Sequence, residues 1–207
     1  MTTIVLIAKE PLPGKAKTRL HPALTLEQAA GIAAASIDDT LTALAAVPAT
    51  RRILAFDGNR LPPKSERFEV LHQVNGDLDE RLGAIFDACD GPMVLIGMDT
   101  PQVTAAHLAP AFTSWPDDID AWFGPANDGG FWALGMAEPR GDLILGVPMS
   151  RDDTGEIQLQ RLVDAGLSVS MLPTLTDVDT IDSARAVAEL APHGTFASTL
   201  ACFGALS

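Results

Sequence analysis

The sequence predicts an α/β domain in which a mostly parallel sheet carries helices on both faces. Short apolar, β-branched runs alternate with longer segments of helical periodicity along most of the 207 residues, which is typical of βα units. Hydrophobic residues make up 47% and charged residues 20%, so the chain can bury a substantial core. No repeat, linker or low-complexity segment divides it. We therefore expect one domain over residues 1–207, with a core of about residues 2–190 and a C-terminal tail, 191–207.

The first half of the chain shows clear element boundaries. Residues 2–8 are short, apolar and β-branched, which predicts a strand. Thr25, followed three residues later by Gln28, matches a capping box at the start of a helix over 26–46, which ends before Pro48. The next predicted elements are a strand at 52–56, a weaker strand at 68–73 and a helix at 77–90 with apolar residues at helical spacing.

The second half continues the alternation with one interruption. Residues 92–96 form the most apolar strand, and Thr104 can cap a helix through about Trp115. Strands at 121–123 and 131–136 flank a Gly-rich turn, which predicts a hairpin or an antiparallel strand. The last predicted elements are a helix at 154–165 closed by Gly166, a strand at 167–172 and a helix at 182–190.

A basic loop directly follows the first strand. Residues 9–20 read K-E-P-L-P-G-K-A-K-T-R-L and contain Lys9, Lys15, Lys17 and Arg19, in a chain of net charge -13. In open α/β sheets ligands bind at the carboxyl ends of strands, so this position favours a polyphosphate site over a solvated basic loop. If the loop is extended, Lys17 and Arg19 project to the same side. The predicted nucleotide-binding residues are Ala8, Lys9, Gly14, Lys15, Lys17, Thr18 and Arg19.

Several classes of protein are disfavoured. The loop lacks the first glycine and the hydroxyl of a Walker A motif, and it has only one of the three glycines of a dinucleotide-binding fingerprint. The net charge of -13 argues against nucleic acid and anionic membrane surfaces as partners. Cys89 and Cys202 have no metal-ligand spacing and suit a reducing compartment. With no apolar stretch long enough to span a membrane, we expect a cytoplasmic location.

Three carboxylates follow two of the predicted strands. Asp99 comes directly after the most apolar strand, and Asp177 and Asp179 lie two residues apart near the end of a later one. Carboxylates facing a cationic loop predict a site for Mg²⁺ or Mn²⁺ with nucleotide phosphates. Turn and cap chemistry is the alternative, and for Asp179 a helix cap is an equal alternative. Asp128, in N-D-G-G, is first a hairpin-turn residue and second a candidate acceptor base.

These motifs together resemble a known family. K-E-P-L-P-G-K-A-K-T-R-L, G-M-D-T-P, G-P-A-N-D-G-G and D-V-D-T, in this order over about residues 3–190, resemble an uncharacterised bacterial family usually labelled glycosyltransferase. Its fold is the GT-A, nucleotide-diphospho-sugar transferase fold, a Rossmann-like three-layer α/β/α sandwich. More distantly, the chain is similar to the phospholactate and phosphoenolpyruvate guanylyltransferases.

The resemblance implies roles for individual residues. Lys17 and Arg19 would bind nucleotide phosphates, and the three carboxylates Asp99, Asp177 and Asp179 would hold divalent metal. Met149 and Phe131 stand where the family pattern has Trp and Tyr, and both positions would shape an acceptor pocket.

Three functions are compatible with these observations. The favoured one is a metal-dependent nucleotidylyltransferase that joins a nucleotide to a small phosphorylated acceptor and releases pyrophosphate, with Lys17, Arg19, Asp99 and Asp128 as the catalytic candidates. The basic first loop favours it, because the triphosphate tail needs cations. A glycosyltransferase that uses a nucleotide-sugar is the second. A non-catalytic nucleotide-binding module is the third and least favoured, because such a module has no need for three carboxylates opposite four cations.

Overall fold

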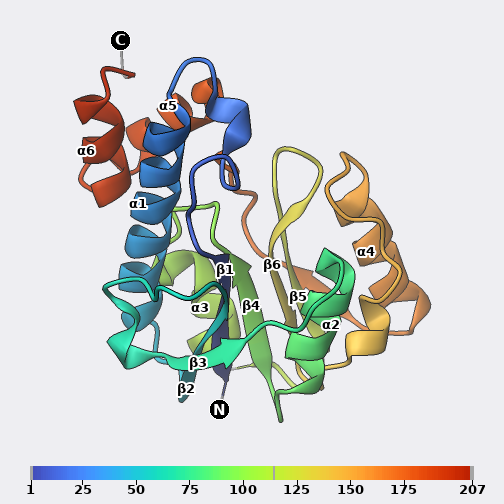
Figure 1. Ribbon diagram of the computed structural model, residues 1–207. Coiled ribbons are helices and arrows are strands. Elements are labelled where there is room, and N and C mark those ends of the chain that lie inside the picture. The colour runs from blue at the N-terminus through green and yellow to red at the C-terminus, as the bar shows by residue number, and fades with distance from the viewer. Residues whose placement is uncertain (1, 114, 206–207) are drawn as a thin grey trace.

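The fold is a seven-stranded sheet between layers of helices (Figure 1). A computed structural model describes residues 2–113 and 115–205; residues 1, 114, 206 and 207 of the predicted domain lie outside it. The strands are β1 Thr3–Lys9, β2 Arg51–Asp57, β3 Glu69–His72, β4 Met93–Gly97, β5 Ala121–Pro125, β6 Phe131–Met136 and β7 Val169–Met171. The α-helices are α1 Leu26–Ala45, α2 Leu78–Asp87, α3 Ala105–Thr113, α4 Thr154–Asp164, α5 Ile181–Leu190 and α6 Thr195–Cys202.

The sheet is mostly parallel, as predicted. Its strand order is β3-β2-β1-β4-β6-β5-β7. Strands β3, β2, β1 and β4 pair in parallel, as do β5 and β7. Strand β6 runs antiparallel to both of its neighbours, β4 and β5, because a tight turn joins it to β5. The prediction of an antiparallel element near the Gly-rich turn is therefore confirmed.

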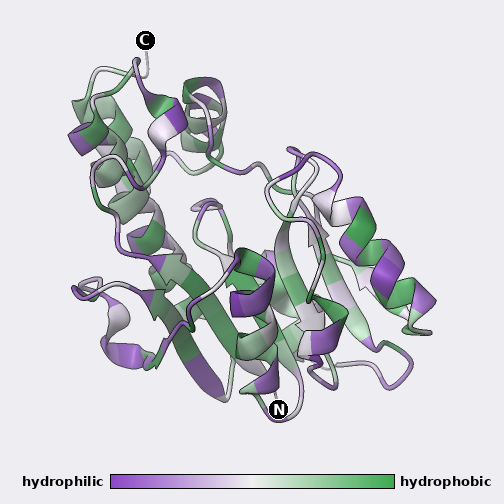
Figure 2. Ribbon diagram, turned by 45° about the vertical axis from the view of Figure 1, so that its right-hand side comes forward, coloured by the Kyte–Doolittle hydropathy of each residue, from purple (hydrophilic) through white to green (hydrophobic). Residues whose placement is uncertain are grey.

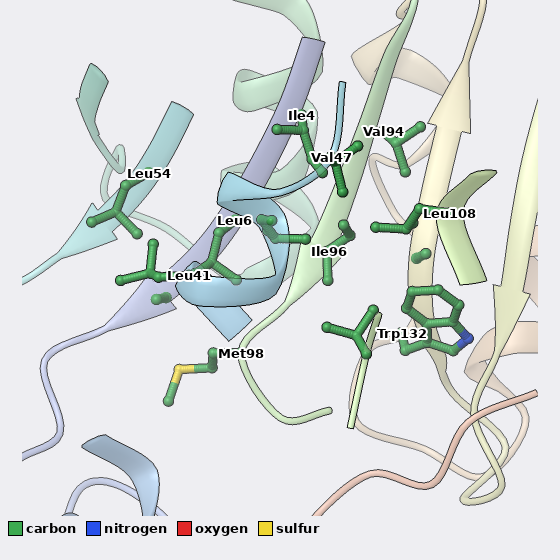
Figure 3. Close-up of a cluster of buried hydrophobic side chains, with 14 of the residues drawn as sticks. Ile4, Leu6, Leu41, Val47, Leu54, Val94, Ile96, Met98, Leu108 and Trp132 are labelled. Atoms are coloured by element: carbon green, nitrogen blue, oxygen red, sulfur yellow. The ribbon is translucent and has the colours of Figure 1, made fainter. Parts of the chain in front are cut away.

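Alternate side chains of each strand enter opposite layers of core. On β1, Ile4 and Leu6 pack in the cluster that contains residues of α1 and α3, whereas Val5 packs in the cluster with residues of α2 and α4. Figure 3 shows part of the first cluster, to which α1 contributes Leu41, β1 contributes Leu6 and β2 contributes Leu54. The strands are mostly hydrophobic along their length (Figure 2), as expected for a sheet that is buried on both faces.

The helix boundaries follow local signals in the sequence. Thr25 caps α1, with its hydroxyl accepting from the Gln28 N–H and the Gln28 side chain accepting from the Thr25 N–H. This is the capping box that the sequence predicts. Asp77 and Glu80 form a second capping box at the start of α2. At the end of α4, Gly166 has a φ of +83°, which is the left-handed C-terminal geometry expected there.

Helix α6 lies in the segment that was predicted only as a tail. Its first turn has no local side-chain cap; instead the Asp39 carboxylate of α1 accepts hydrogen bonds from the N–H groups of Thr195 and Phe196, at 2.9 and 2.8 Å. Phe196 and Leu200 are fully buried in a third apolar cluster shared with α1 and α5. Figure 1 shows α6 beside α1. A cap supplied from a distant part of the chain explains why the sequence pattern missed this helix.

The direction of the strand order reverses between β1 and β4. From β1 the chain moves outward to β2 and β3, then returns to the other side of β1 with β4. Connections that leave neighbouring strands in opposite directions open a crevice at the strands' carboxyl ends, where such folds bind ligands. The basic loop after β1 and Asp99 after β4 both lie at this point. In the described residues, no helix combines the length and the apolar character needed to cross a membrane.

Candidate nucleotide and metal site

The basic loop is coiled rather than extended. Gly14 takes a φ of +75°, Lys17 has left-handed backbone angles of φ 51° and ψ 38°, and residues Thr18–Leu20 form a 3-10 turn. Two apolar side chains, Ala16 and Leu20, are buried and fix the loop against the core. The premise of an extended loop is therefore wrong, because the left-handed backbone of Lys17 and the 3-10 turn after it fold the chain back.

Lys17 reaches the carboxylate that follows β4. Its ammonium lies 2.6 Å from Asp99 Oδ1 and donates a hydrogen bond to the backbone carbonyl of Val178. The Lys17 side chain is only 7% exposed, whereas that of Asp99 is 37% exposed. The Val178 N–H in turn donates to the Asp99 carbonyl at 2.9 Å, which fastens residues 177–179 to the end of β4. One lysine thus joins the basic loop to both carboxylate-bearing segments.

Arg19 forms the second link between the loop and the carboxylates. Its guanidinium lies 2.5 Å from Asp179 Oδ2, and the Arg19 side chain is 72% exposed. The hydrogen bond to Asp179 raises the pKa of Arg19. Thr180, not Asp179, is the N-cap of α5, with its hydroxyl accepting from the Ser183 N–H. The helix-cap interpretation of Asp179 is therefore wrong, and its carboxylate faces the basic loop.

Asp177 lies at the buried side of the same group. Burial, together with the negative charges of Asp99 and Asp128, raises the pKa of Asp177 to about 7, against the opposing charge of Lys17. Burial is the largest cause of this shift, and the neighbouring carboxylates add to it. A perturbed carboxyl beside charged partners at a strand end is typical of functional sites.

The raised pKa of Asp177 predicts a pH dependence of stability. Between pH 4 and pH 7 the folded state holds a proton that the unfolded state, with a pKa near 3.8, has released. The free energy of unfolding therefore falls as the pH rises through this window. We expect a fall of about 2 kcal/mol from pH 5 to pH 8, after allowing for solvent screening. Urea unfolding of the protein and of Asp177→Asn measures it, and parallel pH profiles would contradict it.

Asp128 lies in the turn between β5 and β6. Its Oδ1 atom accepts a hydrogen bond from the Gly130 N–H at 2.9 Å, as in an ordinary Asx turn, and the residue is exposed. The charge of Asp128 acts on both Asp177 and Arg19, so the turn belongs to the same electrostatic group. The hairpin interpretation is confirmed. A role as acceptor base stays a prediction.

The remaining predicted nucleotide-binding residues lie at the end of β1 and in the loop itself. Ala8 is buried near the end of β1 and Lys9 is its exposed last residue. Gly14, Lys15 and Thr18 are exposed along the outer part of the loop. These residues belong to the same segment as Lys17 and Arg19. Among the described residues, the structure records no hydrogen bond or ion pair between them and the three site carboxylates. Their contacts with a nucleotide stay predictions.

Two polar groups near the site were missed from the sequence. The Gln73 side-chain amide donates to the carbonyls of Ala8 and Ala55, at 2.8 and 2.9 Å, and its oxygen accepts from Arg81. Arg81 also pairs with Asp57 at 3.3 Å. This group ties together the carboxyl ends of β1 and β2. Its signal in the sequence is a polar residue at a strand end, the same signal that identified Asp99.

A second group links the carboxylate segments to one another. The Gln102 amide donates to the Thr176 carbonyl at 2.7 Å, and the Asn127 amide donates to the Thr176 hydroxyl at 2.8 Å. Each of these residues lies within three positions of a predicted site carboxylate. They hold the segments after β4, β5 and β7 in register, and no local pattern in the sequence could indicate such contacts.

The donor atoms of this site suit a hard divalent cation. Asp99, Asp177 and Asp179 supply carboxylate oxygens, the ligand type that Mg²⁺ and Mn²⁺ prefer. Asp99 Oδ1 is buried, and apart from the Lys17 ammonium it has no hydrogen-bonding partner among the described residues. No group of three or more His, Cys, Asp or Glu residues within residues 2–113 and 115–205 is arranged to hold a metal ion by itself. These oxygen donors are of the type that such a cation prefers, but in the described part of the chain the three carboxylates do not form a metal site by themselves.

The names of three solved structures with this fold refer to a nucleotide, a nucleotide-sugar or a cytidylyl group. A protein from Desulfovibrio desulfuricans G20, provisionally named a nucleotide-diphospho-sugar transferase, is 24% identical with a TM-score of 0.85, over 99% of this chain and 96% of that one. A cytidylyltransferase from Leptospira borgpetersenii is 12% identical with a TM-score of 0.57, over 98% and 93%. A CMP-2-keto-3-deoxy-manno-octonic acid synthetase complexed with CTP is 14% identical with a TM-score of 0.55, over 92% and 98%. These likenesses establish the fold.

Sequence comparison places the chain in a family. No curated protein sequence matches it. A family model described as "Uncharacterized protein conserved in bacteria (DUF2064)" matches residues 35–151, more than half of the chain. The matched region holds Asp99 and Asp128, whereas the basic loop and Asp177 lie outside it. The chain therefore belongs to the DUF2064 family of bacterial proteins and has the fold of nucleotide-diphospho-sugar transferases.

Proposed function

We propose that this protein is a metal-dependent transferase that uses a nucleotide, and that it transfers a nucleotidyl group to a small phosphorylated acceptor. The observation that carries the proposal is the pair of contacts Lys17–Asp99 and Arg19–Asp179 at the carboxyl edge of the sheet. In a bound metal–polyphosphate complex, the cations of this group would face the negative phosphates and the carboxylates would face the positive metal ion. A fold alone does not fix a reaction, so the proposal rests on this charge pattern.

The residues of the site suggest how the transfer would proceed. Arg19 is exposed and can offer two N–H groups to phosphate oxygens, whereas Lys17 offers a point charge. An acceptor oxygen would form a bond to the α-phosphorus while the bond to the pyrophosphate oxygen breaks. Lys17 and Arg19 would hold the departing pyrophosphate and neutralise its charge. A divalent cation, with Asp99, Asp177 and Asp179 among its ligands and phosphate oxygens as the others, would supply further neutralisation of the phosphate charge.

Glycosyl transfer from a nucleotide-sugar is the second candidate. One observation favours it: Asp128 is exposed on the β5–β6 turn and electrostatically linked to the site, as an acceptor base would be. Phe131 and Met149, at the positions expected to shape the acceptor pocket, are half-buried against the same apolar cluster. The nucleotidyl alternative is preferred because a triphosphate tail would need cations such as Lys17 and Arg19 to neutralise it.

Release of pyrophosphate distinguishes the two reactions. We expect pyrophosphate when the protein is incubated with Mg²⁺, one of the four nucleoside triphosphates and a mixture of small phosphorylated acids. A coupled pyrophosphate assay follows the product, and Asp99→Asn provides the inactive control. Release of nucleoside diphosphate from a nucleotide-sugar, with no pyrophosphate from any triphosphate, would contradict nucleotidyl transfer and support glycosyl transfer.

A further inference from the structure

Lys17 and Arg19 contact the carboxylates in different ways. Arg19 is 72% exposed and can swing away from Asp179 into solvent without loss of hydration. Lys17 is only 7% exposed, and its ammonium is fixed between Asp99 Oδ1 and the Val178 carbonyl. Its left-handed backbone, with φ at 51°, is uncommon for a residue other than glycine. Such conformations persist where the surroundings enforce them, and they cluster at ligand-binding segments.

The position of the Lys17 ammonium matters for any cation that uses Asp99. A divalent ion bound to Asp99 would lie within a few ångströms of a buried ammonium, and like charges in a poorly hydrated site repel strongly. Little of the Lys17 side chain reaches solvent, and its loop is held by buried Ala16 and Leu20. It can leave Asp99 only if another anion replaces the carboxylate, because an unpaired buried charge is costly.

We propose that Lys17 is a specificity-determining residue that keeps free divalent cations out of the carboxylate group and admits them only together with a polyphosphate. Phosphate oxygens replace Asp99 as the ion-pair partner of the Lys17 ammonium, and the Asp99 carboxylate is then free to bind the cation. Each ligand thereby removes the obstacle to the other, which is positive coupling between two binding events. The identity of the polyphosphate as a nucleotide rests on the proposed function, but the exclusion of free cations does not.

The first test measures Mn²⁺ alone, without nucleotide. Electron paramagnetic resonance of free Mn²⁺ gives its affinity for the protein, for Lys17→Met and for Lys64→Met. Lys64 is the matched control because it also pairs with an aspartate, Asp38, at 2.8 Å, outside this carboxylate group. We expect Lys17→Met to bind Mn²⁺ roughly 10- to 100-fold more tightly than the unaltered protein, a range typical of coupled sites. Lys64→Met should match the unaltered protein.

Two further variants keep the outcome clear. Lys17→Gln keeps an N–H group that can donate a hydrogen bond to the Val178 carbonyl. It replaces Lys17→Met in the experiment if that variant does not fold. In Lys17→Met with Asp99→Asn, the gain in Mn²⁺ affinity should disappear, which assigns it to this site. Unchanged or weaker Mn²⁺ binding by folded Lys17→Met and Lys17→Gln, or a gain that survives Asp99→Asn, would overturn the inference.

A calorimetric titration tests the other half of the coupling. Inorganic triphosphate with Mn²⁺ in slight excess should bind the unaltered protein at least about 10-fold more tightly than triphosphate in EDTA or Mn²⁺ alone. Equal affinities in all three titrations would contradict the inference. If the Mn²⁺ results hold but no nucleoside triphosphate binds with metal, the exclusion by Lys17 stands and the proposed function fails.

Discussion

Asp99→Asn is expected to lose at least about 100-fold in Mg²⁺-dependent affinity for a nucleoside triphosphate, or about 2.7 kcal/mol. An amide oxygen is neutral and binds a hard cation more weakly than a carboxylate does. The substitution also removes the charge that orients the Lys17 ammonium, which lies 2.6 Å from Asp99 Oδ1. The fold should survive, because Lys17 keeps its hydrogen bond to the Val178 carbonyl and the amide oxygen introduced at position 99 can still accept from the ammonium.

Isothermal titration of nucleotide with Mg²⁺ and with EDTA measures this effect. The control is Asp142→Asn, which removes a carboxylate that pairs with Arg140 at 2.7 Å outside the site. Nucleotide affinity of Asp142→Asn should equal that of the unaltered protein. An Asp99→Asn variant that binds nucleotide with unchanged metal dependence would show that Asp99 is not a metal ligand.

Gly129→Ala is expected to cost about 3–4 kcal/mol of stability and to distort the turn that carries Asp128. Gly129 has a φ of +87°, and a Cβ atom there would lie 1.8 Å from the Asp152 carbonyl oxygen. That oxygen belongs to the backbone and cannot rotate away. The close contact is part of the joint between the hairpin and the start of α4, where the Gly155 N–H donates to the Gly129 carbonyl at 2.8 Å.

Gly146→Ala supplies the matched control. Gly146 has a similar φ of +77°, but no heavy atom lies within 4 Å of its added Cβ. Its substitution should therefore introduce only the backbone strain, about 1 kcal/mol. Thermal unfolding of both variants should place Gly129→Ala roughly 5–10 °C below Gly146→Ala. Equal unfolding midpoints would mean that the hairpin can move away from α4.

The elements were predictable where their signals are local. A short stretch of sequence determines each of three features: the capping box of Thr25 and Gln28, the apolar run of β4 and the left-handed Gly166. Helix α6 escaped prediction because its cap is Asp39, more than 150 residues earlier in the chain. Propensity and periodicity carry no information about such partners.

The site was predictable in position but not in contacts. Carboxyl ends of parallel strands lie at one edge of the sheet, so Asp99 and the basic loop could be assigned to the same edge from the sequence. The coiled loop, the burial of Lys17 and its contact with Asp99 depend on packing of Ala16 and Leu20, which no spacing rule describes. The same holds for the Thr176 contacts with Gln102 and Asn127.

A thermal-shift panel most directly tests whether these strand ends bind a metal–nucleotide complex. The protein is heated with each nucleoside triphosphate and nucleotide-sugar, with Mg²⁺ and with EDTA. At about 100 times the dissociation constant, binding should raise the unfolding midpoint by roughly 5–10 °C. We predict this rise for at least one triphosphate with Mg²⁺, and not with EDTA or in Asp99→Asn. If no nucleotide raises the midpoint, or if the rise is the same in EDTA and in Asp99→Asn, the carboxyl edge of this sheet is not a metal–nucleotide site.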